Sequence, residues 1–324
     1  MDALGVGDMS KSAVIFPGQG AQSVGMGRDI AEGSARARAI FDRADEVLGF
    51  SLSRMCFEGS AESLERTDVQ QPAIFTTGVA IWEAFLEAGG RRDAFACAGG
   101  LSLGEYTALH VAGAMSFEDA LRLVRRRGQL MQEAACATPS GMVSLVGADE
   151  AAADDLCARA RGDGVLVPAN FNCPGQIVVA GSRAACERAV TLAEATLLRA
   201  IPLAVAGAFH SPLMASAAEG LAPVLDKTVF ESPAIPVVAN VDAEYHGGAD
   251  AIRRSLRRQV VEAVRWQRCI ERMIADGVAR FVEMGPGRVL TGLMRKIDRT
   301  RATVYISTRE SLRAAAAELD GVSV

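Results

Sequence analysis

Short apolar runs that end in glycine or proline alternate along this chain with longer segments of helical periodicity. The first run, Ser12–Phe16, leads into Pro17-Gly18-Gln19-Gly20, and a helical pattern follows over Ala35–Leu48. An apolar run closed by turn residues predicts a buried strand. Because strands that alternate with helices form mostly parallel sheets covered on both faces, the sequence predicts an α/β fold.

The same alternation continues in two blocks, one on each side of the middle of the chain. The further predicted helices are Gln71–Ala88 (with Pro72 in its first turn), Glu105–Ala112, Ser116–Ala135, Pro212–Lys227, Asp250–Val261, Arg265–Ala275 and Val289–Arg295. The further predicted strands are Ala94–Ala98, Ile235–Ala239, Ala279–Met284 and Thr303–Ile306. We expect these blocks to form one large, discontinuous domain of residues 1–137 and 208–324.

In residues 138–207 the order of predicted strands and helices is different. The pattern there predicts, in order, strand Gly141–Val146, helix Asp149–Arg161, strands Val165–Phe171 and Gln176–Ala180, helix Ser182–Glu194 and strand Thr196–Leu203. The order β-α-β-β-α-β is the ferredoxin-like arrangement. We therefore expect residues 138–207 to form a small ferredoxin-like subdomain that is inserted into the larger domain.

Composition and charge exclude several classes of protein. Half of the 324 residues are hydrophobic and 23% are charged, which is enough for a large core and argues against disorder. The net charge of −5 argues against a nucleic-acid-binding protein. No run of 18 apolar residues occurs, and Met1–Lys11 lacks the apolar stretch of a signal peptide, so we expect neither membrane insertion nor export.

Seven cysteines are scattered through the chain without paired spacing. An odd number of cysteines with no C-x-x-C pattern argues against a disulfide framework and against a zinc site. We therefore expect a cytoplasmic protein without a bound metal.

The candidate nucleophile is Ser102, in the turn Gly100-Leu101-Ser102-Leu103-Gly104. This G-x-S-x-G pattern lies between a predicted strand and a predicted helix, where a sharp turn lifts the hydroxyl out of the sheet. Backbone N–H groups at the start of the helix can then stabilise an oxyanion. The alternative is a tight turn whose serine only caps the helix.

A nucleophilic serine needs a base, and the chain has three histidines. His210 follows the insert directly, in a loop before a helix, and is the best candidate. His110 lies two helical turns beyond Ser102, where a packed or surface role is expected. His246 precedes Gly247-Gly248, and we expect it on a solvated loop.

Six segments in order along about 280 residues carry a resemblance to a known family. They are Phe16-Pro17-Gly18-Gln19-Gly20, Ser102-Leu103-Gly104-Glu105-Tyr106, Arg127-Gly128, Ala208-Phe209-His210-Ser211-Pro212-Leu213-Met214, Asn240-Val241 and Glu283-Met284-Gly285-Pro286-Gly287. With them the chain resembles the malonyl-CoA:acyl-carrier-protein transacylases, and it is similar to the acyltransferase domains of polyketide synthases. The resemblance implies a hydrolase-like α/β core with the ferredoxin-like insert.

The resemblance also implies a mechanism. Ser102 attacks the thioester of malonyl-CoA while His210 takes its proton, and the backbone N–H groups of Gln19 and Leu103 bind the oxyanion. The malonyl-Ser102 ester then passes to the phosphopantetheine thiol of acyl carrier protein, in a ping-pong reaction. Coenzyme A enters as a thioester substrate, and the reaction needs no permanently bound cofactor.

Four further residues match family positions. Arg127 corresponds to the arginine that binds the malonyl carboxylate, a group that a planar guanidinium holds with two bonds. Without the resemblance, Arg125-Arg126-Arg127 is better explained as a solvated charge run. The resemblance places Gln259 where a backbone carbonyl orients the histidine. It assigns Asn240 to support of the His210 loop and makes Phe209 a residue typical of malonyl selection.

One residue departs from the family pattern, because Leu101 stands where a histidine usually precedes the nucleophile. We expect this change to alter the polarity of the cleft, the preference for the acyl group or the rate of hydrolysis. It also leaves open a non-catalytic homologue that only docks a carrier protein, and the serine turn by itself allows a serine hydrolase of esters or thioesters.

Acyl carrier proteins are acidic, so we expect a basic docking face on a monomeric chain. The candidate residues are Arg253, Arg254, Arg257 and Arg258, with Arg288, Arg295 and Lys296. The sequence does not distinguish fatty-acid from polyketide synthesis.

Overall fold

A four-stranded parallel sheet forms the centre of the larger part of the molecule. The structure is a computed structural model that describes residues 11–194 and 198–319. The sheet has the order β2-β1-β7-β8, and every neighbouring pair is parallel. Its strands are β1 (Lys11–Phe16), β2 (Phe95–Gly100), β7 (Val278–Met284) and β8 (Ala302–Ile306). The predicted α/β class with a mostly parallel sheet is therefore confirmed.

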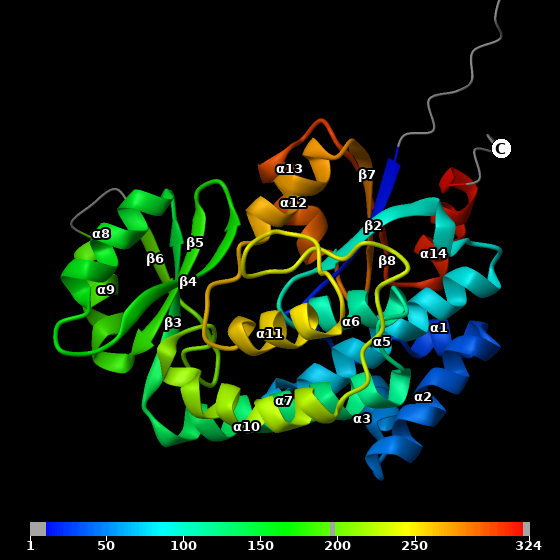
Figure 1. The fold of residues 1–324 in the computed structure, drawn as a ribbon, viewed down its shortest axis with the longest axis horizontal. Helices are drawn as coiled ribbons and strands as arrows, with labels where there is room; N and C mark the ends of the chain where they lie inside the picture. The colour runs from blue at the N-terminus through cyan, green and yellow to red at the C-terminus, as the bar shows by residue number, and fades with distance from the viewer. Residues whose placement is uncertain (1–10, 195–197, 320–324) are drawn as a thin grey trace, which may run out of the picture.

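Helices surround this sheet on both faces (Figure 1). They are α1 (Arg28–Gly33), α2 (Ala35–Leu48), α3 (Leu52–Glu58), α4 (Ala61–Glu65), α5 (Thr67–Glu87), α6 (Leu103–Val111), α7 (Phe117–Ala137), α10 (Ala215–Lys227), α11 (Ala249–Gln259), α12 (Trp266–Ala275), α13 (Val289–Ile297) and α14 (Arg309–Leu319), with short 3₁₀ turns at Arg92–Ala94 and Pro212–Met214. Helices α1, α3 and α4 are short, and the sequence pattern did not predict them.

Helix α5 runs through the core, and every residue from Thr67 to Trp82 is buried. Such a helix is expected to be apolar around its whole circumference. It starts four residues before the predicted Gln71, so Pro72 lies inside the helix rather than in its first turn. Packing explains this: the carbonyl of Thr67 lies so close to Gly128 of α7 that a Cβ on Gly128 would come within 2.6 Å of it. Tertiary contact here outweighs the cost of about 3 kcal/mol for a proline inside a helix.

A second, antiparallel sheet lies to one side of the first (Figure 1). Its order is β4-β5-β3-β6. The strands are β3 (Ser140–Val146), β4 (Leu166–Cys173), β5 (Gln176–Ser182) and β6 (Arg199–Pro202), and the helices between them are α8 (Glu150–Ala160) and α9 (Arg183–Glu194). The predicted strand Thr196–Leu203 begins in positions 196–197, which lie outside the described residues.

The predicted strand Ile235–Ala239 does not form as a regular strand. Ala98 donates to the carbonyl of Pro236, and Val238 donates to the carbonyl of Ala98, so the segment touches β2 over only two backbone bonds (2.8 and 3.0 Å). Pro236 has no N–H to offer to a sheet. The segment continues to Asn240, which belongs to the candidate active site described below.

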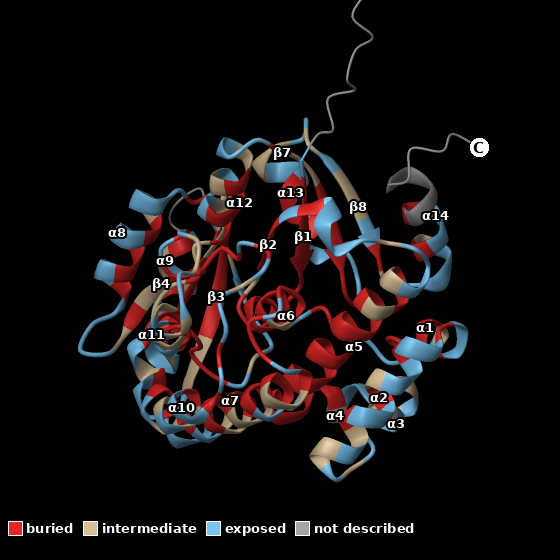
Figure 2. Cartoon of the chain, turned by 45° about the vertical axis from the view of Figure 1, so that its right-hand side comes forward, coloured by how far each residue is buried: buried red, intermediate tan, exposed pale blue. Residues whose placement is uncertain are grey.

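Backbone hydrogen bonds join β4 of the second sheet to the segment just before α12. Phe171 of β4 donates to the carbonyl of Val264, and Val264 donates to that of Ala169, both at 2.9 Å. Figure 2 shows buried residues concentrated in the middle of the molecule, where β1, β2 and α6 meet. No helix within residues 11–194 and 198–319 combines the length and the apolar character that a membrane crossing requires.

Candidate active site

Ser102 occupies a sharp turn between β2 and α6. Its backbone has a φ of 52° and a ψ of −102°, a conformation that costs a residue with a side chain about 1–3 kcal/mol. Both flanking glycines are required, because a Cβ on Gly100 would lie 2.0 Å from the carbonyl carbon of Gly104, and one on Gly104 would lie 2.0 Å from the oxygen of Phe16. The Ser102 side chain makes no capping bond to α6, which excludes the helix-capping alternative.

His210 lies beside the hydroxyl of Ser102. The distance from Ser102 Oγ to His210 Nε2 is 2.8 Å, and the other ring nitrogen, Nδ1, lies 2.6 Å from the backbone oxygen of Gln259. A carbonyl oxygen only accepts, so Nδ1 carries the proton and Nε2 presents a lone pair to the serine. Burial, and then the charge of Arg127, lower the pKa of His210 to about 3, so the ring is neutral at physiological pH.

Arg127 reaches the same hydroxyl from α7. It is only 1% exposed, so it does not belong to a solvated charge run. Its Nη2 donates to Ser102 Oγ and to Gln259 Oε1, both at 3.0 Å, and its Nη1 donates to Gln71 Oε1 at 2.7 Å. Burial lowers the pKa of Arg127 below its ordinary value. A guanidinium nevertheless stays protonated, so a cation that contacts no carboxylate of the described residues lies beside the nucleophile.

Asn240 supports the serine turn rather than the His210 loop, which corrects the expectation from sequence. Its Oδ1 accepts from the backbone N–H of Ser102 at 2.7 Å, and its Nδ2 donates to the carbonyl of Gly100 at 2.8 Å. The reason is topological: the segment before Asn240 runs along β2, so its end lies beside the end of that strand.

The two proposed oxyanion donors lie on either side of the turn. Leu103 is the first residue of α6, and helices leave the N–H of their first residues without an internal acceptor. The N–H of Ser102 itself is occupied by Asn240. On the other side, the Pro17–Gly20 loop touches the turn, because a Cβ on Gly18 would lie 2.3 Å from the oxygen of Leu101. Gln19 follows directly and lines the same cavity as Ser102.

A cavity of about 200 Å³ opens on Ser102 and His210. Residues 138–207 line it with Met142, Asn170, Asn172, Gln176, Val178, Leu203 and Val205, and the rest of the molecule lines it with Gln19, Leu101, Met131, Phe209, Val289 and Leu293 as well. The cavity therefore lies where residues 138–207 meet the rest of the molecule, and most of its wall is apolar.

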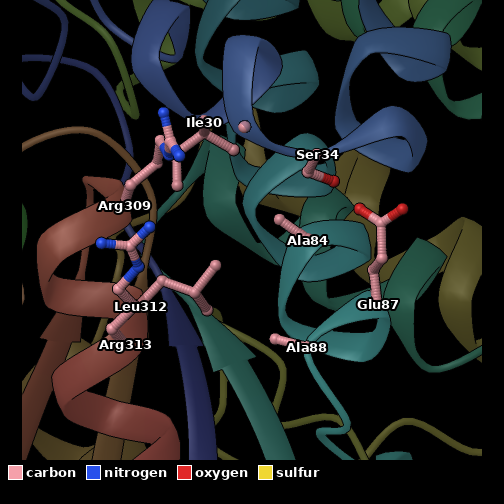
Figure 3. Close-up of a pocket in the computed structure, with 9 residues that line it drawn as sticks. Ile30, Ser34, Ala84, Glu87, Ala88, Arg309, Leu312 and Arg313 are labelled. Atoms are coloured by element: carbon pink, nitrogen blue, oxygen red, sulfur yellow. The ribbon is translucent and has the colours of Figure 1, made fainter.

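Larger cavities lie elsewhere. One of about 430 Å³ lies between α1, α5 and α14, where Arg309 and Arg313 lie across from Glu87 and Ala88 (Figure 3). None of its lining residues belongs to the Ser102 cluster. The size of a cavity thus does not locate the chemistry in this molecule.

Three polar residues of the site went unrecognised in the sequence. Gln71 holds Arg127, and Glu105 accepts from Gln259 Nε2 at 2.7 Å. His246, which we expected on a solvated loop, has a side chain only 1% exposed and contacts Glu105 Oε1 at 2.8 Å, so that expectation was wrong. Glu105 lies in the segment Ser102–Tyr106 that carried the resemblance, whereas Gln71 and His246 had no recognisable signal.

His110 is packed, as expected. Its Nδ1 lies 3.0 Å from the oxygen of Met115, and its ring packs against those of Phe75 and Phe117, which also stack on each other. In the part of the chain that the structure describes, no group of three or more His, Cys, Asp and Glu residues is placed to hold a metal ion.

Comparison with known proteins adds to this geometry. A family model described as an acyl transferase domain matches residues 14–308. The chain is 44% identical to the malonyl CoA-acyl carrier protein transacylase of Bacillus subtilis (strain 168), over 95% of this chain and 96% of that protein. It is 42% identical to the protein of the same name from Escherichia coli (strain K12), over 96% and 100% of the two chains.

Solved structures agree with these relatives. An acyl carrier protein S-malonyltransferase from Vibrio cholerae superposes with a TM-score of 0.91 at 42% identity, covering 94% of this chain and 100% of that one. A malonyl-transacylase solved in complex with its type II polyketide synthase acyl carrier protein gives a TM-score of 0.92 at 41% identity, covering 95% and 100%.

Proposed function

The chain belongs to the acyl transferase domain family, and from this premise we propose that it transfers a malonyl group from coenzyme A to the phosphopantetheine thiol of acyl carrier protein through an ester on Ser102. It is an acyltransferase that supplies fatty-acid or polyketide synthesis. One observation carries the role of Ser102: its Oγ lies between His210 Nε2 at 2.8 Å and Arg127 Nη2 at 3.0 Å.

The first half-reaction begins when Ser102 Oγ attacks the thioester carbonyl and its proton moves to His210 Nε2. The carbonyl of Gln259 stabilises the imidazolium through Nδ1–H, in the place that a carboxylate occupies in many triads. The oxyanion lies against the N–H groups of Gln19 and Leu103. His210 then returns the proton to the departing thiolate, so coenzyme A leaves as a thiol.

The second half-reaction reverses these proton movements. The phosphopantetheine thiol gives its proton to His210 and attacks the ester, and Ser102 recovers a proton as it leaves. Coenzyme A takes part as a thioester substrate, and side chains of this protein perform each step without a permanently bound cofactor.

Arg127 binds the free carboxylate of the malonyl group. Among the described residues its guanidinium donates only to neutral oxygens, those of Ser102, Gln71 and Gln259, and it lies over the ring of Tyr106, so an incoming carboxylate displaces no ion pair. A hydrogen-bonded pair of a guanidinium and a carboxylate is strong in a buried site. Phe209, 4% exposed, and Leu101 line the cavity with apolar surface beside Ser102.

Two alternatives fit the site less well. A hydrolase of apolar esters would place an acyl chain beside the buried charge of Arg127, which is unfavourable. A protein that only docks a carrier protein does not need a serine hydroxyl placed 2.8 Å from a neutral histidine. Intact mass after incubation with malonyl-CoA separates the three: a transferase carries one malonyl group, a hydrolase releases malonate without a lasting adduct, and a docking protein does neither.

Helix α13 is the better candidate for the docking face of acyl carrier protein. Arg253 and Arg258 of α11 are paired with Asp250 and Glu262, both at 2.9 Å, which reduces the positive charge of that helix. On α13 and directly beside it, the exposed basic residues are Arg288, Arg295, Lys296 and Arg299. The same helix lines the cavity through Val289 and Leu293, so an acidic partner there would lie close to Ser102.

The proposal includes the organisation of the chain. The order β4-β5-β3-β6, with α8 and α9 between strands, supports a ferredoxin-like small subdomain at residues 138–207. The parallel sheet and the strand–serine–helix turn support a hydrolase-like large subdomain at residues 1–137 and 208–324. We propose that the protein acts in the cytoplasm as a monomer.

A further inference from the structure

Arg127 is a buried cation that lies over the ring of Tyr106, 5.2 Å from its centroid, and contacts no carboxylate in residues 11–194 and 198–319. Its hydrogen-bond acceptors are the neutral oxygens of Gln71, Ser102 and Gln259, and its Nε has no partner among the described residues. An isolated charge in a protein interior costs several kcal/mol, by order of magnitude, unless another charge compensates it. A compensating charge that does not touch the guanidinium is therefore expected nearby.

Glu105 lies on α6, one turn after Ser102, and is completely buried. Its Oε2 accepts from the backbone N–H of Asn240 at 3.0 Å and from Gln259 Nε2 at 2.7 Å, and its Oε1 contacts His246 Nε2 at 2.8 Å. Each of these partners can donate, which is the arrangement that suits an acceptor-only carboxylate. No arginine or lysine pairs with Glu105 in the part of the chain that the structure describes.

The amide of Gln259 bridges the two charges. Its NH₂ group faces Glu105, and its oxygen accepts from Arg127 Nη2 at 3.0 Å. The opposite orientation would point the amide oxygen at the carboxylate and the NH₂ group at the guanidinium, and both contacts would be repulsive. Glu105 therefore fixes the side chain of the residue whose backbone oxygen holds His210, together with the carbonyl of Ser102, which accepts from the same Nε2 at 2.9 Å.

We propose that Glu105 is the counter-charge of Arg127, acting through Gln259, and that it keeps the buried guanidinium stable while leaving it free to bind a carboxylate. A direct ion pair would have to break each time a malonyl group arrived. With the amide in between, the substrate displaces only neutral oxygens. This inference deepens the proposed function, because it takes the malonyl carboxylate as the group that Arg127 binds.

The variant Glu105→Gln removes the charge while keeping the shape. Its amide oxygen can still accept from Asn240 and Gln259, and its NH₂ group can donate to His246 Nε2 in the other tautomer of that ring. The matched partner is Arg127→Met, which keeps an unbranched buried side chain and removes the cation. The Tm of the full chain is measured for the wild type, both single variants and the double variant, with and without malonate, against sodium chloride of equal ionic strength.

We expect E105Q to lower the Tm by several degrees in the wild-type background, and by less than half as much in the R127M background. Malonate should raise the Tm of E105Q at least twice as much as that of the wild type, because it supplies the missing negative charge, and it should have no such effect on R127M. If E105Q does not fold but the double variant does, the proposal is supported in its strongest form.

Equal losses of Tm in both backgrounds, or unfolding of both E105Q and the double variant, would overturn the proposal, since Glu105 would then stabilise the fold independently of Arg127. An equal malonate shift in E105Q and the wild type would also overturn it. The coupling between the two charges is measured without acyl transfer. Acylation of the wild type by malonyl-CoA tests the proposed function separately, so either can fail while the other stands.

Discussion

Arg127 Nη2 donates to Ser102 Oγ at 3.0 Å, so the residue assigned to the substrate carboxylate already contacts the nucleophile in the resting protein. The contact holds the hydroxyl oxygen in place while its hydrogen points to His210. Binding of a malonyl group would draw the guanidinium toward the carboxylate and free the serine oxygen for attack. On the proposed function, substrate recognition and activation of the nucleophile would be joined in one side chain.

Replacement of Arg127 by methionine should affect malonyl transfer far more than acetyl transfer. Loss of a buried, charged pair with the substrate costs roughly 2–5 kcal/mol, or about 30- to several thousand-fold in kcat/KM. Acetyl-CoA has no carboxylate to lose, so its kcat/KM should change by less than tenfold. Single-turnover acylation with both thioesters measures the ratio, and equal losses would assign Arg127 a structural role only.

The pH dependence of acylation should differ between the free enzyme and the substrate complex. Burial, and then Arg127, lower the pKa of His210 to about 3, so the base of the free enzyme is lost only as the pH falls toward 3. We expect kcat/KM for malonyl-CoA to be flat from about pH 5 to pH 8.

A malonyl carboxylate that pairs with Arg127 neutralises the second of these causes, so the pKa of His210 should rise in the complex. The acid limb of kcat should therefore lie at higher pH for malonyl-CoA than for acetyl-CoA. The Tm is measured at each pH as a control for unfolding. If kcat/KM for both substrates instead fell with a pKa near 6.5, His210 would not have the lowered pKa on which this prediction rests.

Asn240 should matter for the shape of the serine turn rather than for the position of His210. Asn240→Leu removes the acceptor for the Ser102 N–H and the donor to the Gly100 carbonyl, each a buried bond whose loss costs about 1–3 kcal/mol. We expect a lower Tm and a 10- to 100-fold lower kcat with little change in KM. Asn240→Asp keeps the first acceptor and serves as the control; if it behaved like the leucine variant, the Ser102 contact would not be the important one.

Charge reversal on α13 should impair the second half-reaction selectively. The double variant Arg288→Glu, Arg295→Glu is compared with Arg36→Glu on α2, which reverses one charge on another face. We expect the KM for acyl carrier protein to rise at least tenfold in the first variant only. Malonyl-pantetheine, which carries no phosphates, is used as the acyl donor. Any weaker binding of coenzyme A by the variant then does not affect the measured KM for acyl carrier protein. An unchanged KM for the carrier protein would exclude α13 as its docking face.

The sequence predicted those parts of the site that depend on local pattern. Gly100 is needed because the backbone approaches itself within the turn, and Gly104 is needed because the end of β1 lies against it; both glycines belong to one short pattern around Ser102 that can be recognised in the sequence. The parallel sheet likewise followed from apolar runs alternating with helices. The start of α5 at Thr67 was missed because packing against Gly128, distant in sequence, outweighs the local signal of Pro72.

The buried polar network was not predictable in the same way. Glu105 and His246 lie 141 positions apart and meet only because the end of β2 and the Asn240 segment converge. A histidine before two glycines has the local signature of a surface loop, and nothing in its neighbours along the chain indicates burial. The role of Asn240 was misassigned for the same reason: its partners are set by the course of the segment beside β2.

The most direct test of the central claim follows one malonyl group through both half-reactions. The protein is mixed with a stoichiometric amount of malonyl-CoA, and intact mass and peptide mapping locate the adduct; phosphopantetheinylated acyl carrier protein is then added. We predict one malonyl group on Ser102, its transfer to the carrier protein at the same rate as it leaves the serine, and no adduct in Ser102→Ala. Release of free malonate without transfer, or an adduct on another residue, would contradict the account.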